Sequence, residues 1–166
     1  MTKNCFVLVL VLACICVCMP TYADETDASS REDDAVISHY RKIAREHPNT
    51  QKAADALYNA GILHEKRGAF GKAVGFYRLA GSNSADKSFV VKVQLQIGQI
   101  YEKTKEYDKA IEVYRDSLDK CSGNEELARV MRQISYAYLS QKKYSEGFEV
   151  LKKIIKKFPN TVHASD

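Results

Sequence analysis

The sequence predicts an all-α fold in which about seven antiparallel helices stack as a repeating array of helix pairs. Three observations lead to this prediction. Residues of the same kind recur every 37 positions, and within each recurrence they follow the i, i+3, i+4, i+7 spacing of one helix face. Only 3 of the 166 residues are proline, whereas an all-β chain of this length would need many more turn residues.

The first 23 residues differ from the rest of the chain. Lys3 is followed by an apolar run over residues 6–18, then by Pro20 and by small residues at Thr21 and Ala23. An apolar run of this length spans about 20 Å as a helix, less than the ~30 Å core of a bilayer. The pattern is typical of a secretory signal peptide cleaved after Ala23, with an uncleaved membrane anchor as the alternative. We therefore expect a periplasmic or secreted protein.

Four of the five cysteines lie in this presumed signal peptide. The residues that end at Cys14 resemble a bacterial lipobox imperfectly, so lipidation at Cys14 would give a membrane-anchored lipoprotein instead. Cys121 alone would remain after cleavage, and we expect it to be a small residue beside a turn. A single thiol forms no internal disulfide and supplies no metal-ligand spacing, so we predict no metal site.

After the signal peptide, residues 24–33 are polar and acidic without apolar periodicity, and they are predicted to be a disordered leader. Ser29 and Glu32 have the spacing of a capping box for the helix that follows. The helical domain is predicted over residues 34–166. It comprises one helix at 34–47 and three helix-pair units at 54–87, 91–124 and 128–161.

Columns of equivalent residues define these units. Small residues at two positions of each unit are expected to let helix backbones approach closely, namely Gly61, Gly98 and Ser135 together with Ala73, Ala110 and Gly147. We expect Tyr77 and Tyr114 to fill the space between neighbouring units, because one helix pair cannot bury its apolar stripe alone.

The columns resemble the tetratricopeptide repeat, although its usual period is 34. In the first unit they are Leu57, Ala60, Gly61, His64, Gly68, Phe70, Ala73, Tyr77 and Ala80. The resemblance implies a right-handed superhelical solenoid that binds partners in a concave groove lined by the first helix of each pair. Residues 48–58, followed by Gly61, are similar in style to periplasmic repeat proteins of the Tol–Pal coordinator CpoB/YbgF and the outer-membrane assembly lipoprotein BamD type. The chain lacks an oligomerising coiled-coil segment like the coordinator's and a clear lipobox like the lipoprotein's.

Alignment to the repeat places polar, cationic and aromatic residues in this groove. They are Asp55, Tyr58, Asn59 and Ile62 in the first unit, Lys92, Leu95, Gln96 and Gln99 in the second, and Arg129, Arg132, Gln133 and Tyr136 in the third. The amides Asn59, Gln96 and Gln133 form one column and could pair with the backbone of an extended peptide, because each amide donates and accepts. Ordinary solvated helix surfaces are the alternative reading for the amides and for both arginines.

The end of the chain repeats an earlier four-residue motif. Residues 158–161 (Phe-Pro-Asn-Thr) match residues 47–50 (His-Pro-Asn-Thr), which precede the first helix of a predicted pair. We therefore expect Ile154, Ile155 and Phe158 to be partly exposed at an uncapped end, since terminal repeats usually need a polar cap. Either the chain is a fragment of a longer protein, or this end docks on a partner or a second copy.

No catalytic motif or phosphate-binding loop is present in the sequence, and a net charge of +4 without a basic stripe argues against nucleic acid. We predict an exported scaffold, without enzymatic activity or cofactor, that binds a protein or peptide in bacterial envelope assembly or maintenance. Membrane contact is expected only through lipidation. The alternative is an oligomerisation or docking module of a longer exported protein.

Overall fold

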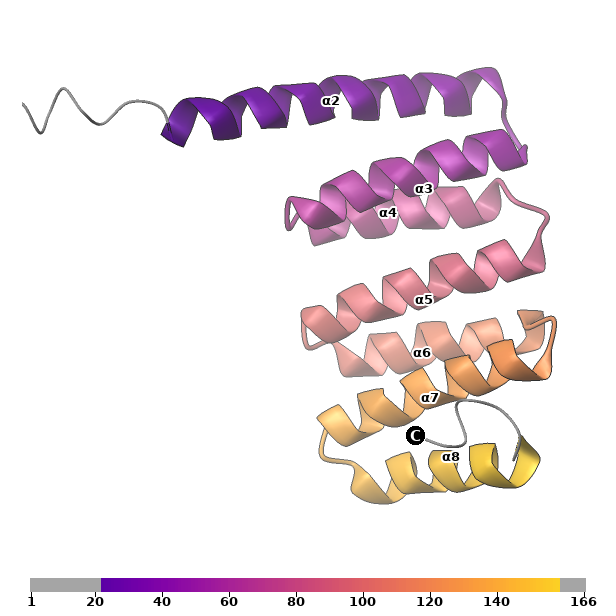
Figure 1. The fold of residues 1–166 in the computed structure, drawn as a ribbon. Coiled ribbons are helices and arrows are strands. Elements are labelled where there is room, and N and C mark those ends of the chain that lie inside the picture. The colour runs from indigo at the N-terminus through magenta and orange to yellow at the C-terminus, as the bar shows by residue number, and fades with distance from the viewer. Residues whose placement is uncertain (1–21, 159–166) are drawn as a thin grey trace, which may run out of the picture. The chain divides into compact units, whose positions relative to one another are not determined.

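The computed structural model describes residues 22–158, with side chains from residue 31 onward. These residues form seven α-helices, one short 3-10 helix and no strand, as the sequence predicted (Figure 1). The elements are α2 (Tyr22–Glu46), α3 (Gln51–Lys66), α4 (Phe70–Ser82), α5 (Lys87–Lys103), α6 (Tyr107–Ser117), η1 (Leu118–Lys120), α7 (Asn124–Ser140) and α8 (Tyr144–Lys157). Within this range no helix is long and apolar enough to cross a membrane.

The chain divides into residues 1–36 and 37–166. Of the first part, the structure describes the beginning of α2. The helix starts at Tyr22, so residues 24–33, predicted to be disordered, are helical instead, and the predicted capping box at Ser29 does not begin a helix. Polar composition misled the prediction, because residues 22–46 contain no proline or glycine to break a helix. Cys14 and residues 1–21 of the predicted signal peptide (1–23) lie outside the described range, and the predicted cleavage site after Ala23 falls at the start of α2.

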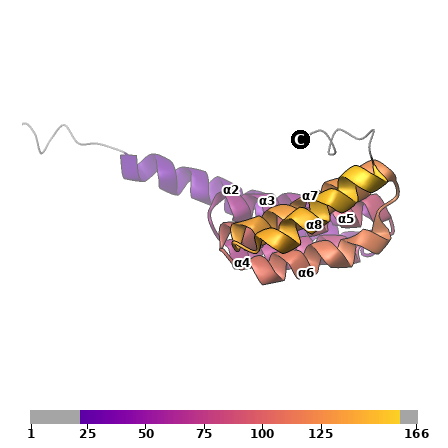
Figure 2. The same cartoon turned by 90° about the horizontal axis from the view of Figure 1, so that it is seen from below.

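In the second part, three antiparallel pairs follow one another: α3 with α4, α5 with α6, and α7 with α8. Each second helix also packs on the next first helix, α4 on α5 and α6 on α7 (Figures 1 and 2). The first helices begin at residues 51, 87 and 124, three or four residues before the predicted unit starts. At α3 and α5 the capping residues explain the shift, since the Thr50 side chain accepts from the Ala53 amide and the Asp86 side chain accepts from the Ser88 amide.

The small-residue column holds each pair together through an aromatic ring. A Cβ atom added to Gly61 would lie 2.6 Å from Tyr77, and one added to Gly98 would lie 2.1 Å from Tyr114. Both rings therefore pack on the glycine of their own pair, which the sequence analysis did not anticipate. Tyr77 also joins the core cluster that includes Phe89 of α5, so the ring contributes to the contact between pairs as well.

The third pair is built differently at the same positions. Ser135 and Leu151 replace the glycine and the tyrosine. The buried Ser135 hydroxyl donates to the Gly147 carbonyl oxygen at 2.8 Å, which joins α7 to α8 by a hydrogen bond instead of a ring. A Cβ atom on Gly147 would lie 2.8 Å from Leu139, so a close helix approach is kept.

The turn inside each pair places one residue in the left-handed region. Its φ is +71° at Gly68, +63° at Lys105 and +63° at Lys142, at intervals of 37 residues. Only the first pair has the glycine that this conformation favours. The turns therefore repeat in geometry even where the sequence does not.

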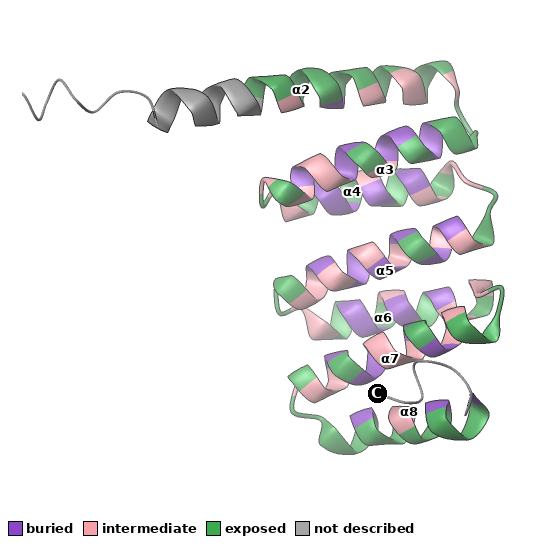
Figure 3. Ribbon diagram, in the orientation of Figure 1, coloured by how far each residue is buried: buried purple, intermediate pink, exposed green. Residues whose placement is uncertain are grey.

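The outer side of α8 is exposed (Figure 3), but not at all the residues predicted. Ile154 and Phe158 are buried against Ala128 of α7, and Ile155 alone of the predicted three is exposed. The buried pair points inward because residues 150, 154 and 158 form the inner stripe of α8.

A clearer signal lies at Phe148. The equivalent residues on α2, α4 and α6 are Ile37, Val74 and Ile111, which are 6%, 9% and 5% exposed. Phe148, in contrast, is 55% exposed. Val74 and Ile111 belong to clusters with residues of the next first helix. Phe148 thus occupies a position that, in the two preceding pairs, packs against the following helix.

Candidate partner-binding surfaces

We call the surface formed by the twelve predicted groove residues of α3, α5 and α7 the first-helix face. Five of its residues are exposed: Asp55, Asn59, Lys92, Arg129 and Tyr136. Six more are partly buried: Tyr58, Ile62, Gln96, Gln99, Arg132 and Gln133. Eleven of the twelve side chains are therefore at least partly exposed.

Leu95 is the exception. It is 7% exposed and belongs to a core cluster with Val130 and Ile134 of α7. Its place in the groove was inferred by alignment to an exposed column. In the structure α7 covers it, so Leu95 contributes to packing between pairs and is not available to a partner.

Two aromatic–cation pairs stand on the first-helix face. The Lys92 ammonium lies 4.3 Å from the centroid of the Tyr58 ring, and the Arg132 guanidinium lies 5.8 Å from that of Tyr136. Tyr58 also packs against Tyr77 and Phe89 in tilted and edge-on arrangements. Such contacts restrict the rotamers of the aromatic side chains before any partner arrives.

The predicted amide column is uneven. Asn59 is exposed, whereas Gln96 is partly buried within hydrogen-bonding reach of Glu65 and Tyr77. Gln96 therefore already has partners inside the protein. The amides that the sequence analysis placed in one column therefore do not have equivalent surroundings in the structure.

Glu65 of α3 and Glu102 of α5 are repeat-equivalent carboxylates with different surroundings. Glu65 accepts from the Tyr77 hydroxyl at 2.8 Å and from the Lys103 ammonium at 2.5 Å. Ser140 replaces that lysine in the next repeat, so no equivalent ammonium reaches Glu102. One Glu102 oxygen and the Tyr114 hydroxyl are buried without a hydrogen bond at ordinary distance among the described residues.

The pKa values follow this difference. Burial alone would raise the pKa of Glu65, but the bonds from Lys103 and Tyr77 outweigh burial and lower it. Burial raises the pKa of Glu102, and the nearby Tyr114 hydroxyl only partly opposes the effect. Burial and these carboxylates also raise the pKa of both tyrosines well above the ordinary phenol value.

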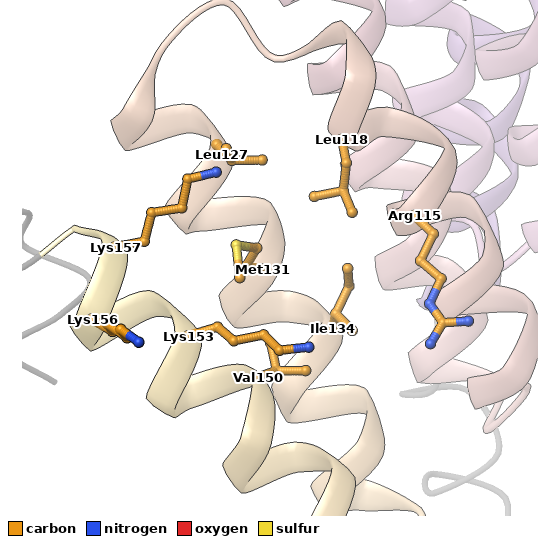
Figure 4. Close-up of a pocket in the computed structure, with 9 residues that line it drawn as sticks. All are labelled: Arg115, Leu118, Leu127, Met131, Ile134, Val150, Lys153, Lys156 and Lys157. Carbon is orange, nitrogen blue, oxygen red and sulfur yellow. The ribbon is translucent and has the colours of Figure 1, made fainter.

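A second surface was not predicted as a site. A pocket of about 660 Å³ opens between α6 with η1 on one side and α8 on the other, with α7 beneath (Figure 4). Its apolar lining consists of Leu118, Leu127, Met131, Ile134 and Val150, and its cationic lining consists of Arg115, Lys153, Lys156 and Lys157. One feature of the sequence could have indicated this surface. Two lysine pairs, at residues 152–153 and 156–157, interrupt the apolar pattern of α8.

Arg115 is held in place on the α6 wall. Its guanidinium donates to the Tyr138 hydroxyl at 2.6 Å, and Arg78 makes the same contact with Tyr101 one repeat earlier, at 3.4 Å. The arginine is therefore a structural feature of the repeat that also reaches the pocket. Cys121 lies beside η1, where its thiol donates to the Ser117 carbonyl oxygen and burial raises its pKa.

Comparisons with known proteins agree with this architecture. Two family models, each described as "Tetratricopeptide repeat", match residues 91–119 and 129–161. These two segments are therefore similar to tetratricopeptide repeats. No curated protein matches the sequence, so the likeness to the Tol–Pal coordinator and the assembly lipoprotein stays a prediction.

The chain is also similar to solved structures. One, described as "MamA RS-1 ArsTM double mutant", aligns with a TM-score of 0.57 and 18% identity, covering 81% of this chain and 71% of its own. A second, "Crystal structure of MamA protein", has a TM-score of 0.38 and 20% identity, covering 80% of this chain and 86% of its own. At 18% identity the first likeness supports the fold alone. The TM-score of the second structure is too low to support an argument.

Proposed function

We propose that this chain is an exported scaffold that binds a protein or peptide through its first-helix face, in cell-envelope assembly or maintenance. Tetratricopeptide repeats support the scaffold role, because stacked helix pairs present extended surfaces for binding. The secretory pattern of residues 1–23 supports export. The scaffold would hold its partner without changing it covalently.

The observation that carries this proposal is the exposed, positioned aromatic at Tyr136. This side chain is 42% exposed and has the Arg132 guanidinium over its ring. Aromatic residues and arginine are enriched among the residues that contribute most to binding, and a pre-positioned ring loses less entropy on association. Tyr58 with Lys92 offers a second such point on α3 and α5.

A photo-crosslinking amino acid at position 136 tests the proposal in cells. Leu79 on α4 is a matched control, because it is an apolar side chain with 53% exposure away from the first-helix face. We expect position 136 to trap one defined protein that position 79 does not trap. With that protein purified, Tyr136→Ala should weaken binding about fivefold or more. The same products from both positions would refute a specific face.

A second function, docking or self-association through the outer side of α8, is favoured by Phe148. Large exposed apolar side chains at Tyr144, Phe148 and Ile155 follow the spacing of one helix face. Exposed apolar patches of this kind mark interaction sites. This surface lies on α8, so it is separate from the first-helix face.

Sedimentation of the purified chain over a range of concentrations tests this second function. If two copies meet through α8, the chain should be dimeric at micromolar concentration and Phe148→Glu should make it monomeric. Leu79→Glu adds the same charge at an equally exposed site and should leave the dimer intact. A wild-type chain that stays monomeric up to about 100 μM would exclude self-association in the useful range.

A further inference from the structure

The pocket between α6 and α8 has a character that the preceding repeat lacks. Its floor includes Met131, where the equivalent residue one repeat earlier is Gln94. A flexible thioether adapts to different apolar side chains better than an amide does. The floor of this pocket is therefore apolar and adaptable, as sites that receive apolar ligand groups commonly are.

The charge of the walls is equally specific. Lys153 and Lys156 stand on α8, where the equivalent residues of the preceding repeat are Asp116 and Asp119. Two positions that carry aspartate in the preceding repeat therefore carry lysine in this pocket. No acidic side chain lines the pocket among the described residues.

Lys152 and, more weakly, the charge of Lys153 lower the pKa of the Glu149 carboxyl, but the pocket lysines form no salt bridge within the described part of the fold. Lys152, their neighbour, forms an ion pair with Glu149 at 2.8 Å. No described residue forms a salt bridge with Lys153 or Lys156, and Lys157 lies 5.4 Å from the Phe158 ring centroid. Their ammonium groups are available to an anionic ligand that enters the pocket.

The placement of the cations indicates the shape of that ligand. Lys153 and Lys157 are four residues apart on α8, a rise of about 6 Å along the helix. Arg115 stands on the opposite wall, and apolar side chains lie between the walls (Figure 4). A fatty acid has one anionic group at one end and would engage one wall. A helix with acidic residues on both sides of an apolar stripe matches both walls and the floor.

We propose that this pocket binds an amphipathic helix of a partner protein, with its apolar stripe on Met131 and the surrounding floor. Its flanking Asp or Glu side chains pair with Arg115 on α6 and with the lysines of α8. Docking of an amphipathic helix into an apolar groove is a common mode of recognition, and complementary charges select the partner and its orientation. The site lies apart from the first-helix face, and each can be tested alone.

A designed peptide provides the probe. It is an 18-residue helix with Leu at i, i+3, i+4 and i+7 and Glu on both flanks, and a control peptide carries Lys in place of every Glu. Met131 is one of only 3 methionines in the chain, so labelling methionine methyl groups with ¹³C gives a direct NMR reporter in the pocket. We expect the acidic peptide to shift the Met131 methyl signal and to bind at least tenfold more tightly than the basic peptide.

Three single variants distinguish binding in the pocket from general electrostatic attraction between the peptide and the protein. Lys153→Glu should weaken binding of the acidic peptide about tenfold, whereas Lys152→Glu, the same charge change on the neighbouring residue outside the pocket, should change it less than about threefold. Met131→Gln, which restores the residue type of the preceding repeat, should also weaken it. Circular dichroism of each variant confirms that the helices are retained.

Several results would overturn the proposal. They are no methyl shift at 1 mM peptide, equal affinity for both peptides, or equal losses in Lys152→Glu and Lys153→Glu. Vesicles of phosphatidylglycerol that bind the chain in a Lys153-dependent way, without binding of the acidic peptide, would identify an anionic lipid as the occupant. Self-association that Lys153→Glu abolishes would identify a second copy.

Discussion

Replacing Gly98 with alanine should destabilise the protein, although the change is usually favourable in a helix interior. Alanine is preferred over glycine there by about 1 kcal/mol. At Gly98, however, the new methyl group would lie 2.1 and 2.4 Å from the Cε1 and Cζ atoms of Tyr114. Because Tyr114 is fully buried, its ring cannot move without displacing the core residues around it.

The expected net effect follows from these two contributions. Overpacking in a well-packed core costs about 1–3 kcal/mol, and an overlap this severe belongs at the upper end. Subtracting the helix preference of about 1 kcal/mol leaves a loss of about 2 kcal/mol in the free energy of unfolding. Gly61→Ala should cost less, because its methyl group would lie 2.6 Å from the nearest Tyr77 atom.

Gly75→Ala is the matched control. Gly75 lies in the interior of α4, and a Cβ atom there would meet no atom within 4 Å. Urea unfolding followed by circular dichroism should show this variant to be about 0.5–1 kcal/mol more stable than the wild type. Equal stabilisation by Gly75→Ala and Gly98→Ala would refute the packing argument.

The third pair suggests a rescue. Ser135 and Leu151 occupy there the positions of Gly98 and Tyr114. The double variant Gly98→Ser/Tyr114→Leu should therefore be more stable than the sum of the two single changes implies, by about 1 kcal/mol. Additive effects would mean that the residue in the glycine position and the side chain above it are not coupled.

Four further outcomes can be measured. Lys105→Gly should raise the free energy of unfolding by about 1 kcal/mol, because φ is +63° there; an unchanged urea midpoint would contradict this. Glu65→Gln should lower stability by about 1 kcal/mol at pH 7, and the difference should vanish as pH falls through the lowered pKa of Glu65, since the stabilisation belongs to its carboxylate. Glu102→Gln should instead raise stability at pH 7 and lose this advantage at pH 3.5, because burial favours the protonated carboxyl; the same sign for both variants at pH 7 would be contrary evidence. Mass spectrometry of the exported protein should find Asp24 as the first residue, and a lipid-modified Cys14 would contradict cleavage after Ala23.

The fold could be predicted from the sequence because repetition makes its signal redundant. Each unit of the array repeats the same arrangement of small and aromatic residues, so one departure such as Ser135 does not hide the pattern. The start of α2 could not be predicted in this way. It lies outside the repeat, and its acidic composition is compatible with both helix and disorder.

The binding surfaces were only partly predictable for a related reason. Sequence periodicity shows which helix face a residue occupies, but not whether a neighbouring helix covers it, and Leu95 was misassigned on that account. Phe148 is the reverse case, a residue typical of a buried column that no helix covers among the described residues. The pocket needs α6, α7 and α8 together, so no single stretch of sequence reveals it.

Ser135 and Leu151 of the third pair affect how readily this end of the array unfolds locally. In a repeat protein, stability is approximately a sum of the intrinsic stability of each unit and of the interfaces between neighbours. The third pair lacks the buried tyrosine of the other two, and α8 packs on no later helix among the described residues. Amide hydrogens of α7 and α8 should therefore exchange with solvent sooner than those of α3 to α6. A ligand that bridges α6 and α8 would slow this exchange, so occupancy of the pocket could be followed as added protection at this end of the protein.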